Sequence, residues 1–110
     1  MRVRNLFRDL AAGPNETIDA LLTGRGNATV ERIVSHGERA PAEGVFDQDW
    51  TECVVLLQGE ARLVAQEPDE TFDLKPGDWV EIPPKRRHYV AWTSREPPAV
   101  WLAVHLKPEA

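Results

Sequence analysis

Turn-forming residues interrupt this chain at short and regular intervals, and this spacing restricts its fold more than any other feature. Glycine-based turn signals occur at residues 24–27, 58–60 and 75–78, for example. The stretches between the turns are short and contain many β-branched and aromatic residues, which favour strands. Short strands separated by turns about every eight to twelve residues are typical of an all-β sandwich or barrel.

The pattern predicts a series of short strands. They are expected at residues 28–35, 50–57, 61–65, 71–74, 79–82, 89–92 and 99–106. The second of them carries apolar residues on both faces, so we expect it to be buried on both sides. Glu52 shares one face of this strand with Val54 and Leu56, because side chains alternate along a strand. A buried carboxylate is costly without a partner, so Glu52 needs a cation, a hydrogen-bond donor or water.

Residues 1–27 are predicted to form an N-terminal arm of the same domain, and residues 28–110 the barrel. Three apolar residues near the start have the spacing of one helical turn or of a docked arm, namely Leu6, Phe7 and Leu10. In residues 15–22, Asn15 is suited to cap a helix. The segment is also short enough to be a strand, and both alternatives stay open.

The composition indicates one small domain that needs no disulfide. The chain has 110 residues, 42% of them hydrophobic, and its one cysteine cannot form an internal disulfide. The formal net charge of −5 argues against a nucleic-acid partner. No apolar run approaches the roughly 18 residues that span a bilayer, and the first residues lack the apolar run of a signal peptide. We therefore expect a cytoplasmic protein that binds neither nucleic acid nor membranes.

One segment in the second half of the chain combines a turn, a rigid corner and a histidine. Pro83 ends the strand that follows Gly77, and His88 begins the next strand, at the edge or mouth of the barrel. This spacing resembles the second motif of the cupin superfamily, Gly-x5-Pro-x-Gly-x2-His-x3-Asn, in three of its five fixed positions. Lys85 and Trp92 stand at the other two.

A second match lies upstream. Glu52 and Gly59 have the spacing found at the end of the first cupin motif, Gly-x5-His-x-His-x3-4-Glu-x6-Gly. The two histidines of that motif are absent. Their positions hold, in the two allowed spacings, Phe46 and Gln48 or Val45 and Asp47. Together the two motifs make the chain similar to cupins over roughly residues 30–106.

The resemblance implies an all-β, single-domain jelly-roll barrel of the cupin type, and cupins typically bind one divalent metal inside the barrel. Carried over by position, the metal ligands would be Gln48, Glu52 and His88, with Asp47 and His105 as further candidates. Such nitrogen and oxygen donors suit zinc, iron, manganese or nickel. The implied activity is that of a metal-dependent isomerase, dioxygenase or lyase, and the implied assembly is a homodimer.

A metal-free barrel is the alternative, because both histidines of the first motif are missing. Glu52 and His88 would then hydrogen-bond each other, and the barrel would hold a sugar or a small acid without catalysis. In either case we expect a small polar or anionic molecule as the partner. The predicted rim of its pocket consists of Trp50, Arg86 and Trp92.

The remaining titratable residues allow more than one role. The basic cluster at residues 85–87 is either an ordinary solvated loop or a positive rim that attracts an anionic ligand. His105 shares a strand face with Trp101 and is either a cavity residue or a partly exposed histidine. His36 is expected at the surface of a loop. Cys53 is expected in the core rather than as a nucleophile.

Overall fold

The computed structural model describes residues 1–10 and 16–108, which form eight antiparallel strands and no helix. The strands are β1 Thr17–Arg25, β2 Ala28–Ser35, β3 Thr51–Gln58, β4 Ala61–Ala65, β5 Glu70–Leu74, β6 Trp79–Ile82, β7 His88–Thr93 and β8 Ala99–Leu106. The predicted all-β fold is confirmed. In the described part of the chain, no helix is long and apolar enough to cross a membrane.

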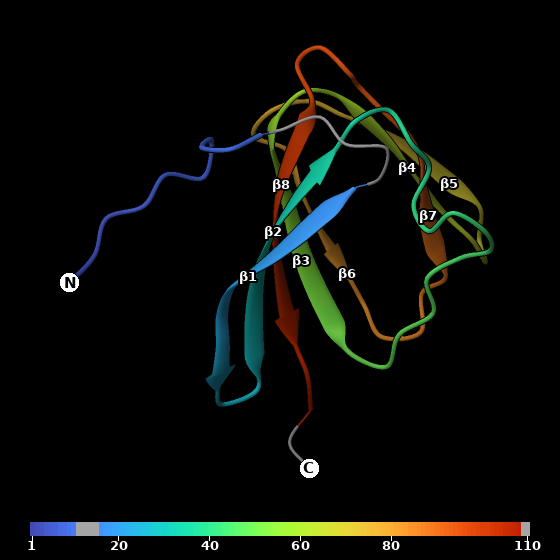
Figure 1. Ribbon diagram of the computed structural model, residues 1–110. Helices are drawn as coiled ribbons and strands as arrows, with labels where there is room; N and C mark the ends of the chain where they lie inside the picture. The colour runs from blue at the N-terminus through green and yellow to red at the C-terminus, as the bar shows by residue number, and fades with distance from the viewer. Residues whose placement is uncertain (11–15, 109–110) are drawn as a thin grey trace.

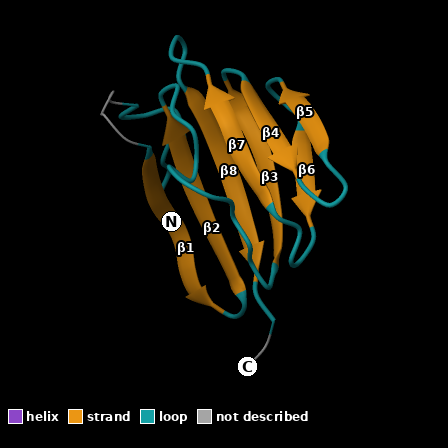
Figure 2. Cartoon of the chain, turned by 90° about the vertical axis from the view of Figure 1, so that its right-hand side faces the viewer, coloured by secondary structure: helices purple, strands orange, loops and turns teal. Residues whose placement is uncertain are grey.

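The strands form two sheets that face each other (Figures 1 and 2). The larger sheet has the strand order β1-β2-β8-β3-β6, and the smaller sheet has the order β5-β4-β7. From β3 onward the chain passes repeatedly from one sheet to the other. Side chains from distant parts of the sequence therefore share one interior.

Apolar side chains from both sheets fill much of this interior. Val54 on β3, Leu63 on β4 and Trp101 on β8 belong to one core cluster. Along β3, every second residue from position 52 to position 56 is buried, as strand alternation requires. The residues between them are only partly buried, so the expectation that both faces of β3 are buried was wrong. Cys53 lies on this partly covered outer face rather than in the core.

The N-terminal region takes the strand alternative rather than the helical one. β1 pairs with β2 at an edge of the larger sheet. Residues 1–10 extend away from the body of the molecule (Figure 1). The Arg32 guanidinium on β2 anchors this extension by donating to the carbonyl oxygens of Leu6 and Arg8. Asn15, the predicted helix cap, lies outside the described residues.

A β-bulge in β7 determines which of its side chains face the interior. Arg62 on β4 pairs with Trp92, but the following residue of β4 pairs with Val90, so Ala91 is an extra residue. His88 and Val90 point into the interior. Beyond the bulge, Trp92 is exposed and its ring lies 5.9 Å from the Arg62 guanidinium. Trp92 therefore does not form the predicted pocket rim.

We expect Gly59→Ala to destabilise the fold more than Gly44→Ala. Both glycines have a positive φ, 84° and 74°, which costs an alanine about 1 to 2 kcal/mol. A Cβ at position 59 would also lie 2.9 Å from Ala99 Cα, whereas one at position 44 meets nothing within 4 Å. Urea unfolding should show a loss of about 3 kcal/mol for Gly59→Ala and about 1 kcal/mol for Gly44→Ala. Equal losses would contradict the close approach at Gly59.

Candidate functional site

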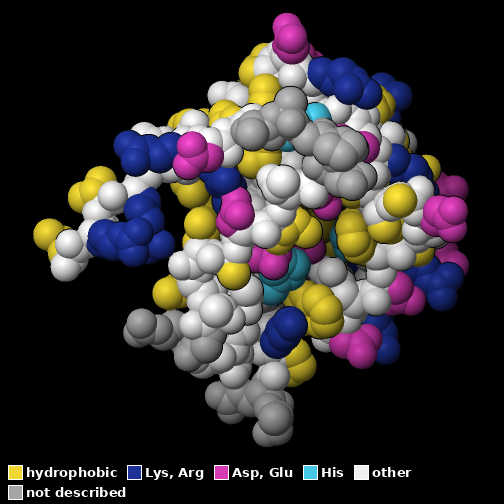
Figure 3. Space-filling model, in the orientation of Figure 1, with side chains coloured by type: hydrophobic (Ala, Val, Ile, Leu, Met, Phe, Trp, Pro, Cys, Tyr) yellow, Lys and Arg dark blue, Asp and Glu magenta, His cyan; other side chains and the backbone are white. Residues whose placement is uncertain are grey.

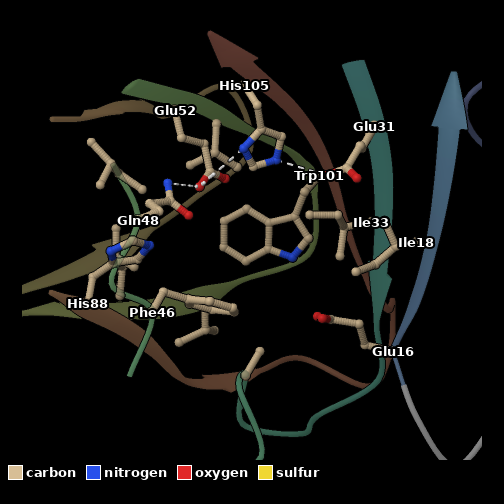
Figure 4. A pocket seen from close by; sticks show the side chains of 15 residues that line it. Glu16, Ile18, Glu31, Ile33, Phe46, Gln48, Glu52, His88, Trp101 and His105 are labelled. Atoms are coloured by element: carbon tan, nitrogen blue, oxygen red, sulfur yellow. Dashed lines mark hydrogen bonds and ion pairs between the residues drawn. The ribbon is translucent and has the colours of Figure 1, made fainter. Parts of the chain in front are cut away.

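One partly enclosed cavity of about 150 Å³ lies between the two sheets (Figure 4). A cavity of this size holds a body about as large as a benzene ring. Most of its wall is apolar and includes Phe46, Val54, Leu63, Val90 and Trp101. The polar side chains that line it are Glu16, Glu31, Gln48, Glu52, His88 and His105. An apolar wall with a few polar groups is the usual composition of a small-molecule site.

The Gln48 amide is the hydrogen-bond partner of Glu52. Gln48 Nε2 donates to Glu52 Oε1 over 2.9 Å, and both side chains are buried. Glu52 lies on the inner face of β3, and Gln48 comes from the loop before it. The Lys85 amide holds this loop by donating to the Gln48 carbonyl oxygen. Gln48 thus supplies the donor that Glu52 requires, in place of the predicted bond between Glu52 and His88.

His105 on β8 is a cavity residue with a fixed tautomer. Trp50 Nε1 donates to His105 Nδ1 over 2.9 Å, so Nδ1 carries no proton. The proton is therefore on Nε2, which donates to Glu31 Oε1 over 2.8 Å. His105 Nδ1 lies 4.0 Å from Glu52 Oε1. Both ring nitrogens of His105 are thus already engaged, and the residue lines the cavity while 15% of its side chain stays exposed.

His88 is held by its backbone neighbours and by an aromatic ring. Its Nδ1 lies 2.8 Å from the Arg86 carbonyl oxygen, which can only accept, so Nδ1 carries the proton. The ring packs against Phe46, with 5.3 Å between ring centroids, and the two residues also form a backbone bridge. Phe46, in one of the positions that cupins give to a histidine, thereby becomes part of the cavity wall.

Glu16, which the sequence did not predict, lies on the other side of the cavity (Figure 4) and pairs with Ser35. Trp101 Nε1 donates to Ser35 Oγ over 3.2 Å, and the Ser35 hydroxyl donates to Glu16 Oε2, also over 3.2 Å. Burial raises the pKa of Glu16 above its ordinary value. The bond from Ser35 opposes this rise in pKa, and the negative charges of Glu38 and Glu31 add to it.

The basic cluster at residues 85–87 is paired with carboxylates outside the cavity. The ion pairs are Lys85 with Asp49 at 3.1 Å, Arg86 with Glu70 at 2.8 Å and Arg87 with Asp47 at 3.3 Å. Most of these side chains are well exposed, so each pair contributes about 0 to 1 kcal/mol. The cluster therefore matches the solvated-loop interpretation better than that of a positive rim.

Besides Trp92, three of the predicted site residues do not line the cavity. Asp47 is exposed and faces Arg87. Arg86 lies against the Glu70 carboxylate and the carbonyl oxygen of Pro68. Trp50 stands behind His105, where its indole N–H orients the imidazole without reaching the cavity itself.

His36 is buried rather than at the surface, with 7% of the residue exposed. Its backbone amide donates to the Glu38 carboxylate. Among the described residues, neither of its ring nitrogens has a hydrogen-bond partner. The expected surface position was wrong because residue 36 directly follows the buried end of β2.

The residues present do not fit a tightly held divalent metal. The positions of the two missing histidines hold Phe46 and Gln48 in one spacing, and His105 already uses both ring nitrogens. Within residues 1–10 and 16–108, no group of three His, Cys, Asp or Glu side chains is arranged to hold an ion. Glu52, His88 and the neutral amide oxygen of Gln48 are the donors that remain, and this set with one imidazole would hold such an ion only weakly.

We expect Glu16→Gln to change the pH dependence of stability. Because the pKa of Glu16 is raised from 4.5 in the folded state, its contribution to stability is full below 4.5 and declines as the pH rises through the raised value. Glutamine does not titrate. The melting temperature of the variant, relative to the parent, should therefore rise between pH 4 and pH 8. A difference that stays constant across this range, as expected for the exposed control Glu43→Gln, would contradict the assigned burial.

Comparison with known proteins identifies the family of this chain. The family model described as Cupin domain matches residues 30–105. A comparison with curated proteins finds no match. A solved structure from Ralstonia eutropha JMP134, provisionally named a mannose-6-phosphate isomerase, is 36% identical, with a TM-score of 0.89 and coverage of 98% of this chain and 100% of that one.

Two more distant structures share the fold. A cupin superfamily protein from Desulfitobacterium hafniense DCB-2 is 20% identical, with a TM-score of 0.73 and coverage of 89% of this chain and 83% of that one. The polyketide cyclase RemF from Streptomyces resistomycificus is 19% identical, with a TM-score of 0.71 and coverage of 87% and 69%. Since the family match spans most of the sequence and the strands form the same fold, the chain belongs to the cupin family.

Proposed function

We propose that this cupin binds a small molecule in the cavity between its sheets and does so without a resident metal ion. The buried Gln48–Glu52 pair, which opens onto an apolar wall, is the observation that supports this most strongly. A folded protein keeps a buried carboxylate beside a cavity only at a cost in stability. A ligand that pairs with Glu52 would offset that cost.

The shape of the wall supports a small, flat ligand. Trp101 and Phe46 present aromatic rings to the cavity, and aliphatic side chains make up most of the rest. A volume of about 150 Å³ accommodates one ring or a short chain with a polar end. The proposed ligand is thus a compact molecule whose apolar body contacts Trp101 and whose polar end reaches Glu52.

A metal-dependent enzyme is the second candidate. His88 and Glu52 both line the cavity, at positions where cupins carry metal ligands. The name of the R. eutropha protein, and that of the polyketide cyclase, show that this fold is associated with catalysis elsewhere. The incomplete ligand set weighs against this candidate, and metal content distinguishes the two.

We expect purified, tag-free protein to contain well under one equivalent of zinc, iron, manganese or nickel by elemental analysis. The same protein should show thermal stabilisation by some single-ring or short-chain compounds. Ala40→Leu, which extends a side chain into the cavity wall, should abolish this stabilisation, whereas Ala42→Leu in the adjacent exposed loop should leave it intact. Stoichiometric metal that is lost in Glu52→Ala and His88→Ala would support the enzyme instead.

We also propose a homodimer formed over β1. This strand is an edge of the larger sheet, and its Ile18 and Leu22 side chains are 55% and 44% exposed. Exposed apolar side chains on a free edge are usually covered by a partner. Ile18 also lines the cavity, so a partner at this edge would help to close it.

Sedimentation at micromolar concentration should therefore show a dimer that Leu22→Asp converts to a monomer. A charge at this position would be buried without a partner in the dimer. Phe72→Asp, at a comparably exposed apolar residue of β5, is the control and should remain dimeric. A monomeric parent protein would refute the proposed dimer.

A further inference from the structure

We infer that the cavity selects a small organic cation, namely a protonated amine with a compact apolar body. The inference rests on the proposed function and specifies the chemical class of its ligand. It follows from the direction of the hydrogen bonds around the cavity. Among the described residues, the polar groups that remain free to meet a ligand are acceptors, apart from the second amide N–H of Gln48.

Two buried side chains show this directly. Gln48 is 8% exposed and uses one of its two amide N–H groups on Glu52, and its amide oxygen faces the cavity (Figure 4). His88 is 4% exposed and uses Nδ1–H on the Arg86 carbonyl, which leaves the lone pair of Nε2. Neither Gln48 Oε1 nor His88 Nε2 has a hydrogen-bond partner in the part of the chain that the structure describes. Each is free to accept a hydrogen bond from water or from a donor group of a ligand.

The three carboxylates that line the cavity are hydrogen-bond acceptors as well. Each accepts one bond from a fixed internal donor, and the pairs are Gln48 with Glu52, His105 with Glu31, and Ser35 with Glu16. Indole N–H groups fix two of these directions, because tryptophan can only donate. Trp50 points at His105 and Trp101 points at Ser35. One oxygen of each carboxylate is thereby satisfied by the protein, and the other is left to accept from a ligand.

The charge balance favours a cation. Among the described residues, three carboxylates line the cavity, and no lysine or arginine does. The nearby basic cluster at residues 85–87 is already paired with Asp47, Asp49 and Glu70. On the face seen in Figure 3, acidic and histidine side chains gather among apolar ones. Over the described part of the lining, an anionic ligand would meet three like charges and no cationic side chain.

The aromatic and aliphatic wall of the cavity favours an organic cation over other hydrogen-bond donors. The aromatic faces of Trp101 and Phe46 suit an ammonium group on a ring or short chain through cation–π and apolar contact. A bare metal ion gains nothing from aliphatic walls. A neutral polyol would bring acceptors as well as donors, and in the described part of the chain only the second amide N–H of Gln48 is left to donate to those acceptors.

The test compares three probes of nearly equal shape by isothermal titration calorimetry on the full chain. They are benzylamine, benzyl alcohol and benzoate, which are cationic, neutral and anionic at pH 7.5. We expect benzylamine to bind at least about tenfold more tightly than benzyl alcohol, because hydrogen bonds to charged groups are the stronger ones. Benzoate should not bind measurably.

Two variants test whether the Glu52 carboxylate causes the preference for a cation. Glu52→Gln keeps the shape of the side chain but removes its charge, so it should reduce the preference for benzylamine over benzyl alcohol by about tenfold. Glu43→Gln makes the same change in an exposed loop and should leave the preference unaltered. Circular dichroism melts of both variants would show that they fold.

The outcomes separate the two proposals. If benzyl alcohol or benzoate binds as well as benzylamine and Ala40→Leu abolishes that binding, the cavity is a ligand site but the cation selectivity is wrong. If none of the three probes binds and a wider set of single-ring compounds is also inactive, both proposals fail. If zinc or manganese binds stoichiometrically and benzylamine does not, the site is a metal site and the inference is overturned.

Discussion

The burial of the Glu52 carboxylate is the constraint on which the interior of this protein depends. Strand alternation places Glu52 on the same face of β3 as Val54 and Leu56, and only 9% of the residue is exposed. A carboxylate in such surroundings needs a donor, and the Gln48 amide supplies it. That bond fixes the loop before β3 against the cavity. It also turns the amide oxygen of Gln48 toward the position that a ligand would occupy.

Two tryptophans set the direction of the remaining hydrogen bonds. Because an indole N–H can only donate, Trp50 fixes the tautomer of His105, and Trp101 fixes the orientation of the Ser35 hydroxyl. Of these two indoles, Trp101 touches the cavity and Trp50 lies behind it. The chain thus departs from the cupin pattern, because Phe46 and Gln48 occupy the positions of the missing histidines. Hydrogen bonds with fixed donors and acceptors, rather than a metal ion, orient the polar side chains of the cavity.

The sequence predicted those parts of the fold and the site that depend on local pattern. Strand positions followed from turn spacing, and motif spacing identified Gln48, Glu52 and His88. Glu16 and Glu31 were not predicted as site residues, because they reach the cavity only through the pairing of β1, β2 and β8, which connects distant segments. Trp92 was misplaced because one bulge residue reverses the alternation of β7. The tautomers of the histidines depend on tertiary contacts, so no sequence pattern could predict them.

Long-range ¹H–¹⁵N NMR of the histidine rings at pH 7.5 tests most directly whether the free polar groups of the cavity are mainly hydrogen-bond acceptors. We expect His88 to carry its proton on Nδ1 and to have an unprotonated Nε2, and we expect His105 to have the opposite arrangement. Benzylamine should shift the His88 Nε2 resonance. A proton on His88 Nε2 in the ligand-free protein would contradict the account, because that nitrogen would then offer a donor to the cavity.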